Sequence, residues 1–381
     1  MNMIRVVIAD DSYFMRKILS DLFSKQPDFK VIDVAVNGKE AIEKAVKLKP
    51  DVMTMDINMP VMDGLTALGI LMKDSPVQVV MFSSLTKEGA DATIKALSLG
   101  AVDFISKTGG SVSTIDTIED EILAKCRAAA KANVRAMSSV TKVESVSIQK
   151  DTLGQKKIEF PLKHVEAMKR LVPDLKSAIM KVVKKRPSGK ASALGHLIVI
   201  GTSTGGPKAL QQVIPALPKD LPCGVLIVQH MPPGFTKSLA DRLDEMSQIC
   251  VKEAENHDII EAGHAYIAPG NYHMVVEKNG NGREIILNQD PPIGTLRPAA
   301  DILFKSAAKF GSDVVSVILT GIGNDGAEGM KEIKDSGGFA IAEHESTTVV
   351  YGMPKTVINL GLPDKVVPLP EVAEAIVQAV R

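Results

Sequence analysis

Charged and hydroxyl side chains follow successive apolar runs in the first third of the chain. Asp10 and Asp11 come after the first run, and Asp56 follows the third. Ser83 and Lys107 come after the next two runs. The carboxyl ends of neighbouring parallel strands open into one crevice, so these groups should meet there. Crowded carboxylates repel each other unless a cation intervenes, and Mg²⁺ suits such a site because it binds carboxylate and phosphate oxygens.

This pattern predicts phosphoryl transfer to a carboxylate. With a metal ion in place, Asp56 could attack phosphorus as a nucleophile and form an aspartyl phosphate. Lys107 would pair with the phosphoryl oxygens, and the hydroxyl of Ser83 would hydrogen-bond one of them. Any one of these residues alone would more often be a helix cap or a loop residue. Their occurrence at successive strand ends favours a site.

A candidate serine nucleophile lies in a glycine-rich stretch later in the chain. Residues 201–206 (GTSTGG) follow an apolar run and fit the pattern G-x-S-x-G around Ser203. Such a turn lifts a serine above a sheet, and the start of the following helix directs free N–H groups towards developing negative charge. A phosphate-binding loop would have a similar sequence, so the motif alone leaves catalysis and phosphate binding open.

A base and an acid for this serine are found at two further strand ends. His230 lies just past the apolar run 224–228, and Asp325 follows the run 314–319. A lone histidine near a strand end is usually structural, but this one should emerge at the same sheet edge as Ser203. Asp325 could orient its imidazole. The order Ser…His…Asp differs from the Ser…Asp…His order of α/β-hydrolases and disfavours that fold.

The same region supports a rival interpretation. Gly321, Gly323 and Gly326 match the dinucleotide fingerprint between a strand and a helix, and Glu343 lies about where a ribose-binding acid is expected. This interpretation accounts for neither the serine nor the histidine.

Alternating strands and helices are predicted in two stretches of the chain. In the first, the expected strands are 4–9, 31–34, 51–55, 78–82 and 102–105. In the second, they are 197–200, 224–228, 264–267, 273–277, 284–287, 314–319 and 339–342, with helices from Lys208, Thr236, Ala299 and Gly326 onward. The fold class is therefore α/β, with two doubly wound domains: a five-stranded parallel sheet, then a mostly parallel sheet with an antiparallel hairpin.

Composition excludes several classes of protein. The 45 Lys and Arg balance the 45 Asp and Glu overall, yet residues 127–190 contain 16 basic and 5 acidic residues. This indicates a basic linker, which could bind an anionic partner but is more commonly just solvated.

The absence of Trp argues against stacking on single-stranded nucleic acid. No apolar stretch approaches the roughly 20 residues that cross a bilayer. Cys126, Cys223 and Cys250 lack metal-ligand spacing and indicate reduced thiols in a cytoplasmic protein.

The first group of residues resembles the response-regulator receiver family. The matching motifs are Asp10-Asp11, Met55-Asp56-Ile57-Asn58-Met59-Pro60, Asp63-Gly64, Ser83 and Lys107. The resemblance implies a flavodoxin-like fold with Mg²⁺ held by Asp11, Asp56 and the Asn58 carbonyl, with Asp10 close by. Thr108 stands where the family usually has proline, which leaves the family's cis peptide at that position open.

The second group resembles the catalytic domain of chemotaxis protein-glutamate methylesterases. The matching stretches are 201–207, 229–235, 263–270, 319–326 and 352–354. The resemblance implies a triad of Ser203, His230 and Asp325, with the backbone N–H groups of Thr204 and Ile322 as oxyanion donors. The family commonly has methionine at the position of Ile322, and a backbone donor survives that difference.

The two resemblances predict three parts: a receiver domain (2–124), a partly helical basic linker (125–190) and a methylesterase domain (191–381). They imply hydrolysis of glutamate γ-methyl esters, and deamidation of glutamines, on the cytoplasmic helices of chemoreceptors. A chemotaxis histidine kinase would activate the enzyme by phosphorylating Asp56. We expect a monomeric cytoplasmic protein with Mg²⁺ in the receiver, no cofactor in the esterase domain, no nucleic-acid partner and no membrane insertion. The alternative is a receiver-controlled module that binds a dinucleotide or a partner without hydrolase activity.

Overall fold

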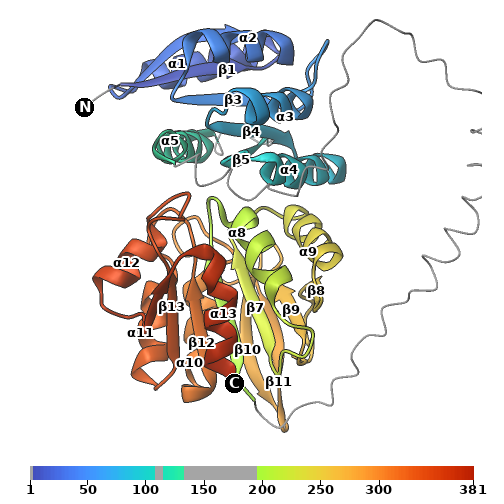
Figure 1. Ribbon diagram of the computed structural model, residues 1–381, viewed down its shortest axis with the longest axis vertical. Coiled ribbons are helices and arrows are strands. Elements are labelled where there is room, and N and C mark those ends of the chain that lie inside the picture. Colours follow the sequence, from blue (N-terminus) through green and yellow to red (C-terminus); the bar gives the residue numbers. More distant parts are fainter. Residues whose placement is uncertain (1–2, 108–114, 133–194) are drawn as a thin grey trace, which may run out of the picture. The chain divides into compact units, whose positions relative to one another are not determined.

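The computed structural model describes residues 3–107, 115–132 and 195–381, which contain two sheet-based regions (Figure 1). They are called here the N-terminal sheet domain, up to residue 132, and the C-terminal sheet domain, from residue 195. Most of the predicted, partly helical linker and the peptide at Thr108 lie outside the described residues.

The N-terminal sheet domain alternates strands and helices. Its elements are β1 (Ile4–Ala9), α1 (Tyr13–Ser24), β2 (Phe29–Ala35), α2 (Gly38–Leu48), β3 (Val52–Asp56), α3 (Gly64–Asp74), β4 (Val79–Ser84), α4 (Lys87–Leu99), β5 (Asp103–Lys107) and α5 (Ile115–Lys131). Ser12, Asn37, Asp63 and Thr86 precede helices α1 to α4, and each side chain accepts a backbone N–H three residues later. These caps explain where the four helices begin.

Its five strands are parallel and lie in the order β2-β1-β3-β4-β5. Alternation along β1 separates the two faces of the sheet. Val6 and Ile8 belong to the core under α1 and α5, whereas Val7 and Ala9 belong to the core under α2, α3 and α4. The chain changes direction across the sheet between β1 and β3, so a crevice opens where these two strands end.

The C-terminal sheet domain is larger. Its helices and strands are β6 (Leu197–Thr202), α8 (Gly206–Val213), β7 (Gly224–Gln229), α9 (Phe235–Met246), β8 (Cys250–Glu253), β9 (His264–Ile267), β10 (His273–Asn279), β11 (Gly282–Asn288), α10 (Ala300–Ala308), β12 (Val314–Ile318), α11 (Ala327–Asp335), β13 (Phe339–Glu343), α12 (Met353–Asn359), β14 (Lys365–Val367) and α13 (Leu369–Val380). Short 3₁₀ turns, Ile214–Ala216 and Gly311–Asp313, precede β7 and β12.

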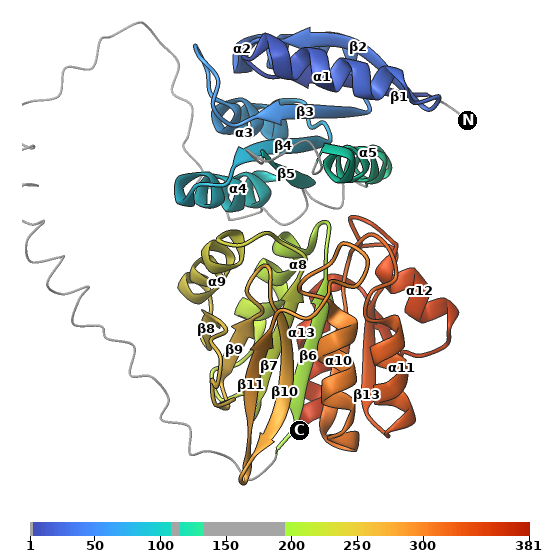
Figure 2. The same ribbon diagram turned by 180° about the vertical axis from the view of Figure 1, so that it is seen from behind.

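Seven of its strands form one parallel sheet in the order β14-β13-β12-β6-β7-β9-β8, and β10 and β11 form a separate antiparallel hairpin. Ile198 and Ile200 pack under α8, α9 and α13, whereas Leu197 and Val199 pack under α10, α11 and the hairpin. Figure 2 shows the hairpin and α10 on the face of the sheet turned towards the viewer. The strand order reverses between β6 and β12, which is where ligands bind in such sheets.

The fold predicted from the sequence is confirmed in both domains. The structure adds elements to this prediction and bears on one expected boundary. Strands β8 and β14 and helices α12 and α13 were not predicted. The expected boundary after residue 124 falls inside α5, whose Cys126 and Ala129 are buried in the N-terminal core. The division into three parts stays a prediction.

Two expectations from the composition concern the cysteines and the length of apolar stretches. Cys126, Cys223 and Cys250 are all unpaired thiols, and burial raises the pKa of Cys126 and of Cys223 to about 12. Among the described helices, none has both the length and the apolar character that a bilayer crossing requires.

Candidate catalytic and phosphoacceptor sites

Three carboxylates gather where β1 and β3 end. Oxygen atoms of Asp10, Asp11 and Asp56 all lie within 4.8 Å of one another. Lys107, from the end of β5, reaches into this acidic crevice: its Nζ lies 3.0 Å from Oδ2 of Asp10 and 2.9 Å from Oδ2 of Asp56. The predicted acids and the predicted lysine are therefore brought together.

Burial and neighbouring charges act in opposite directions on the pKa of Asp56. Burial raises its pKa, Lys107 opposes that rise through a hydrogen bond and its charge, and the charge of Asp10 adds to it, so that the net pKa lies above the ordinary value. A second cation would relieve the crowding of negative charge. The all-oxygen set of Asp10, Asp11 and Asp56 matches the preference of Mg²⁺.

Two further predicted residues lie at the carboxyl ends of β3 and β4. Asn58 follows β3 and is exposed. Ser83 is buried on β4, and its Oγ donates to the backbone carbonyl of Gly89 at 2.9 Å. The Ser83 hydroxyl is thus engaged by the first turn of α4 and would have to rotate to reach a phosphoryl group.

Ser203 follows β6, the central strand of the C-terminal sheet. Its backbone N–H donates to the carbonyl of Thr320 at 3.1 Å, and its own carbonyl accepts from the N–H of Gly206 at 2.8 Å. Gly205 has φ +79°, a conformation that glycine adopts without the strain of a side chain. Gly321 passes so close that a β-carbon on it would lie 2.8 Å from Cβ of Ser203. The serine turn is therefore held from both sides.

His230 and Asp325 meet although 95 residues separate them. Nε2 of His230 lies 2.7 Å from Oδ2 of Asp325. β6 lies between β7, which ends just before His230, and β12, which precedes Asp325. Parallel strands end at one edge of a sheet, so the serine turn lies between the histidine and aspartate turns.

Asp325 is held as an anion. Burial opposes its charge, but His230 and the backbone N–H groups of Asp301 and Ala300 lower its pKa overall. These N–H groups, at the start of α10, donate to Oδ1 at 2.9 Å and to Oδ2 at 2.6 Å. A helix N-terminus favours negative charge, which keeps the carboxylate ionised and fixed in orientation.

The helices that follow the serine, histidine and aspartate turns start without side-chain caps. Gly205, Gly234 and Gly326 precede α8, α9 and α11, each with positive φ and no side-chain cap hydrogen bond. Within the described chain, the backbone N–H groups of Thr204 and Ile322 have no hydrogen-bond acceptor. N–H groups are thus left available at the edge of the sheet where Ser203 lies.

Comparison with known proteins identifies both parts of the chain. A family model for the CheB methylesterase matches residues 198–376, and one for the response regulator receiver domain matches residues 6–119. A protein-glutamate methylesterase/protein-glutamine glutaminase of Symbiobacterium thermophilum is 45% identical over 99% of this chain and 97% of its own. One from Pyrococcus horikoshii is 44% identical over 99% of this chain and 94% of its own. This chain belongs to the protein-glutamate methylesterase/protein-glutamine glutaminase family.

The chain is thus a hydrolase joined to a response regulator receiver domain. The solved catalytic domain of the Thermotoga maritima CheB methylesterase has 45% sequence identity and a TM-score of 0.48, covering 49% of this chain and 99% of that one. The sequence resemblance to receiver and methylesterase families is confirmed over both matched ranges.

In this member of the methylesterase family, Gly321 of the dinucleotide fingerprint packs against Ser203, whereas Gly326 faces Ile318 and Ala300. Glu343 has 0% exposure, and it accepts the backbone N–H of Thr320 at 2.9 Å and the hydroxyl of Thr347 at 3.0 Å. A ribose-binding acid must face a ligand, whereas this carboxylate faces the backbone of the protein. The rival interpretation of the fingerprint is not favoured.

Thr320 and Gln229 were not singled out from the methylesterase sequence. The hydroxyl of Thr320 donates to the carbonyl of Thr204 at 2.9 Å, and the carbonyl of Thr320 accepts from Ser203. The side-chain nitrogen of Gln229 donates to the carbonyl of Ser203 at 2.9 Å. A polar residue that ends a fully apolar strand was the available signal for Gln229, which closes β7 (GVLIVQ).

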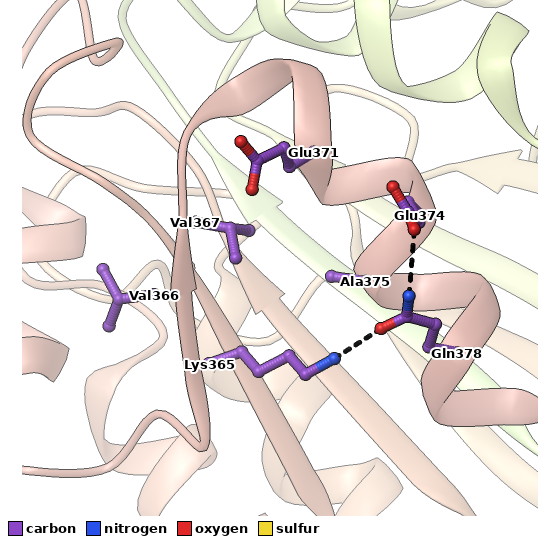
Figure 3. A pocket seen from close by; sticks show the side chains of 7 residues that line it. All are labelled: Lys365, Val366, Val367, Glu371, Glu374, Ala375 and Gln378. Atoms are coloured by element: carbon purple, nitrogen blue, oxygen red, sulfur yellow. Dashed lines mark hydrogen bonds between the residues drawn. The ribbon is translucent and has the colours of Figure 1, made fainter.

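A groove of about 340 Å³ lies between the edge strand β14 and helix α13. Figure 3 shows Glu374, Gln378 and Lys365 joined by two hydrogen bonds along it. None of its lining residues belongs to the serine, histidine or aspartate turns. This groove is therefore separate from the methylesterase site.

Proposed function

We propose that the chain hydrolyses glutamate γ-methyl esters on the cytoplasmic helices of chemoreceptors, using Ser203, His230 and Asp325. The observation that carries this proposal is the 2.7 Å hydrogen bond between His230 and Asp325 beside the serine turn. A serine alone is a weak nucleophile at neutral pH and requires a base that a third group orients.

The chemistry is acyl transfer in two steps. Ser203 Oγ attacks the ester carbonyl while His230 takes its proton, and the N–H groups of Thr204 and Ile322 stabilise the oxyanion. His230 returns the proton to the methoxy group, which leaves as methanol. Water, deprotonated by His230, then attacks the acyl-enzyme and releases glutamate and Ser203. A receptor glutamine would follow the same route and release ammonia.

The hydrogen bond to Asp325 determines which ring nitrogen acts as the base. Nε2 of His230 is bonded to Asp325, so Nδ1 is the nitrogen left for Ser203. In the serine protease triad the roles are reversed, with Nδ1 on the aspartate side. The carboxylate would hold the Nε2–H tautomer and stabilise the imidazolium that forms.

We further propose that phosphorylation of Asp56 activates the hydrolase, with a chemotaxis histidine kinase as the phosphodonor. The cluster of Asp10, Asp11 and Asp56, with Lys107 at 2.9 Å from Asp56, supports this role. Asp11, Asp56 and the carbonyl of Asn58 would hold Mg²⁺, which would neutralise phosphoryl oxygens when bound. Lys107 would exchange its contact with Asp56 for one with the phosphoryl group. A cytoplasmic location follows from these proposed partners.

Methanol release from methylated receptor membranes tests the proposal. We expect the full-length protein to release methanol, to do so faster with Mg²⁺ and acetyl phosphate, and to lose the activity in Ser203→Ala. A matched control is Ser306→Ala, which removes a hydroxyl from α10 that bonds two backbone groups, the N–H of Val276 and the carbonyl of Leu303. Full activity in Ser203→Ala would refute the role of Ser203 as the nucleophile. An unchanged rate of methanol release with acetyl phosphate would refute activation by phosphorylation of Asp56.

A further inference from the structure

Gln229 stands where the two strands that carry the nucleophile and the base separate. It is the last residue of β7 and pairs with Thr202, the last residue of β6. Beyond this rung, the chain from β6 enters the Ser203 turn and the chain from β7 enters the His230 turn. Among the described residues, one backbone hydrogen bond continues the pairing, from the N–H of His230 to the carbonyl of Thr202 at 3.2 Å.

The side chain of Gln229 joins these two turns. Its Nε2 donates to the backbone carbonyl of Ser203 at 2.9 Å and to that of His230 at 3.2 Å. Both partners are acceptors, so the side chain must present its nitrogen to them. Each of the two amide hydrogens is therefore occupied by the carbonyl of a residue in the proposed triad.

The surroundings of Gln229 fix this arrangement. The residue is 2% exposed. Gly206 packs against the amide so closely that a β-carbon on it would collide with Oε1 of Gln229. That oxygen is buried and has no hydrogen-bond partner among the described residues. A buried acceptor without a partner lowers stability, so the amide is retained at a cost to the fold.

We infer that Gln229 is a positioning residue of the hydrolase, which sets the distance between the Ser203 and His230 turns by bonding both carbonyls with one amide. This inference rests on the proposed function. Gln229 cannot itself be an oxyanion donor, because both of its N–H bonds are used within the protein. Its contribution is to the geometry of proton transfer from serine to histidine, which must be accurate to well under 1 Å.

Substitution by methionine removes the two donors and keeps the length of the side chain. Gln229→Met should lower kcat by about 10- to 100-fold and leave KM within about twofold, because misplacement of a reacting group acts on the chemical step. Labelling of Ser203 by a fluorophosphonate should slow by a similar factor. The assay uses the full-length protein with Mg²⁺, acetyl phosphate and methylated receptor membranes.

Gln378→Met is the matched control. Gln378 lies on α13, and its side chain also makes two hydrogen bonds, to Lys365 and Glu374 (Figure 3). We expect its kcat to equal that of the unchanged protein. If Gln229→Met does not fold, the test uses Gln229→Asn instead. This variant keeps an amide, but its side chain is too short to reach both carbonyls. Its kcat should fall with KM unchanged.

Three outcomes would overturn the inference: a kcat for folded Gln229→Met within twofold of the unchanged protein, an equal loss in Gln378→Met, or a normal kcat per fluorophosphonate-titrated site. The last would mean fewer folded molecules rather than poorer geometry. Ser203→Ala in the same assay separates the two proposals. If it retains turnover, the proposed function fails. If it is inactive while Gln229→Met is fully active, only the role of Gln229 fails.

Discussion

The carboxylate of Glu343 accepts the backbone N–H of Thr320 at 2.9 Å while the carbonyl of Thr320 accepts the N–H of Ser203 at 3.1 Å. A fully buried acid thus supports the Ser203 turn through one intervening residue. Burial raises the pKa of Glu343 to about 7, and its hydrogen bonds with Thr320 and Thr347 limit that rise.

The raised pKa of Glu343 predicts a pH dependence of stability. Between its ordinary pKa of 4.5 and about 7, the unfolded chain loses this proton while the folded chain keeps it. The free energy of unfolding should therefore fall as pH rises through this window, by at most about 3 kcal/mol. Glu343→Gln should remove that fall and so gain stability relative to the unchanged protein as pH rises.

Denaturation followed by circular dichroism at several pH values measures this effect, since the sequence has no Trp to serve as a fluorescent probe. The control is Glu345→Gln, which changes an exposed glutamate two residues later. Parallel pH curves for the unchanged protein and Glu343→Gln would show that Glu343 is ionised throughout.

Replacement of Asp325 by asparagine should reduce kcat by about 10⁴-fold, because the imidazole loses the partner that fixes its tautomer. The asparagine amide would also face the N–H groups of Ala300 and Asp301, which need an acceptor. Methanol release measures the change. Asp335→Asn, at the exposed end of α11, should keep the normal rate. Equal rates in the two variants would remove Asp325 from the mechanism.

Replacement of Asp56 by asparagine should abolish covalent labelling by radioactive acetyl phosphate, because the amide is not a nucleophile. The unstimulated rate of methanol release should persist. Asp74→Asn changes an exposed acid at the end of α3 and should be labelled normally. Undiminished labelling of Asp56→Asn would place the phosphoacceptor elsewhere.

Chelation of divalent metal should separate the two sites. Within the described residues, Asp10, Asp11 and Asp56 form the single cluster of potential metal ligands. EDTA should therefore prevent labelling by acetyl phosphate and its stimulation of hydrolysis, and excess Mg²⁺ should restore both. The unstimulated rate should not change. Loss of that rate on chelation would indicate a metal requirement in the hydrolase itself.

The central strands were predictable because their sequences are continuous apolar runs. β6 and β12 are buried on both faces, a pattern typical of parallel sheets. The edge strands β8 and β14 were missed because they are short and carry charged residues, as in CVKE and KVV. Edge strands commonly have such sequences. In this chain β8 is identified by its pairing with β9, and β14 by its pairing with β13.

The proposed triad residues were found because each follows a strand that ends at the same edge of the sheet. The support around Ser203 was less accessible to sequence reasoning. Thr320 and Gln229 act through hydrogen bonds to the backbone of distant turns, and no spacing rule encodes those contacts. Glu343 was noticed, but for a ribose contact, because its complete burial follows only from the packing of β13 within the sheet.

The strand order has a consequence for biosynthesis. β6 and β7 leave the ribosome long before β12, yet β12 must insert between β6 and β13. On the proposed mechanism, a nascent or truncated chain that stops before β12 contains the serine and the histidine without the aspartate. Without that carboxylate the imidazole would have no partner to fix its tautomer, so full hydrolytic activity would have to wait until β12 is in place.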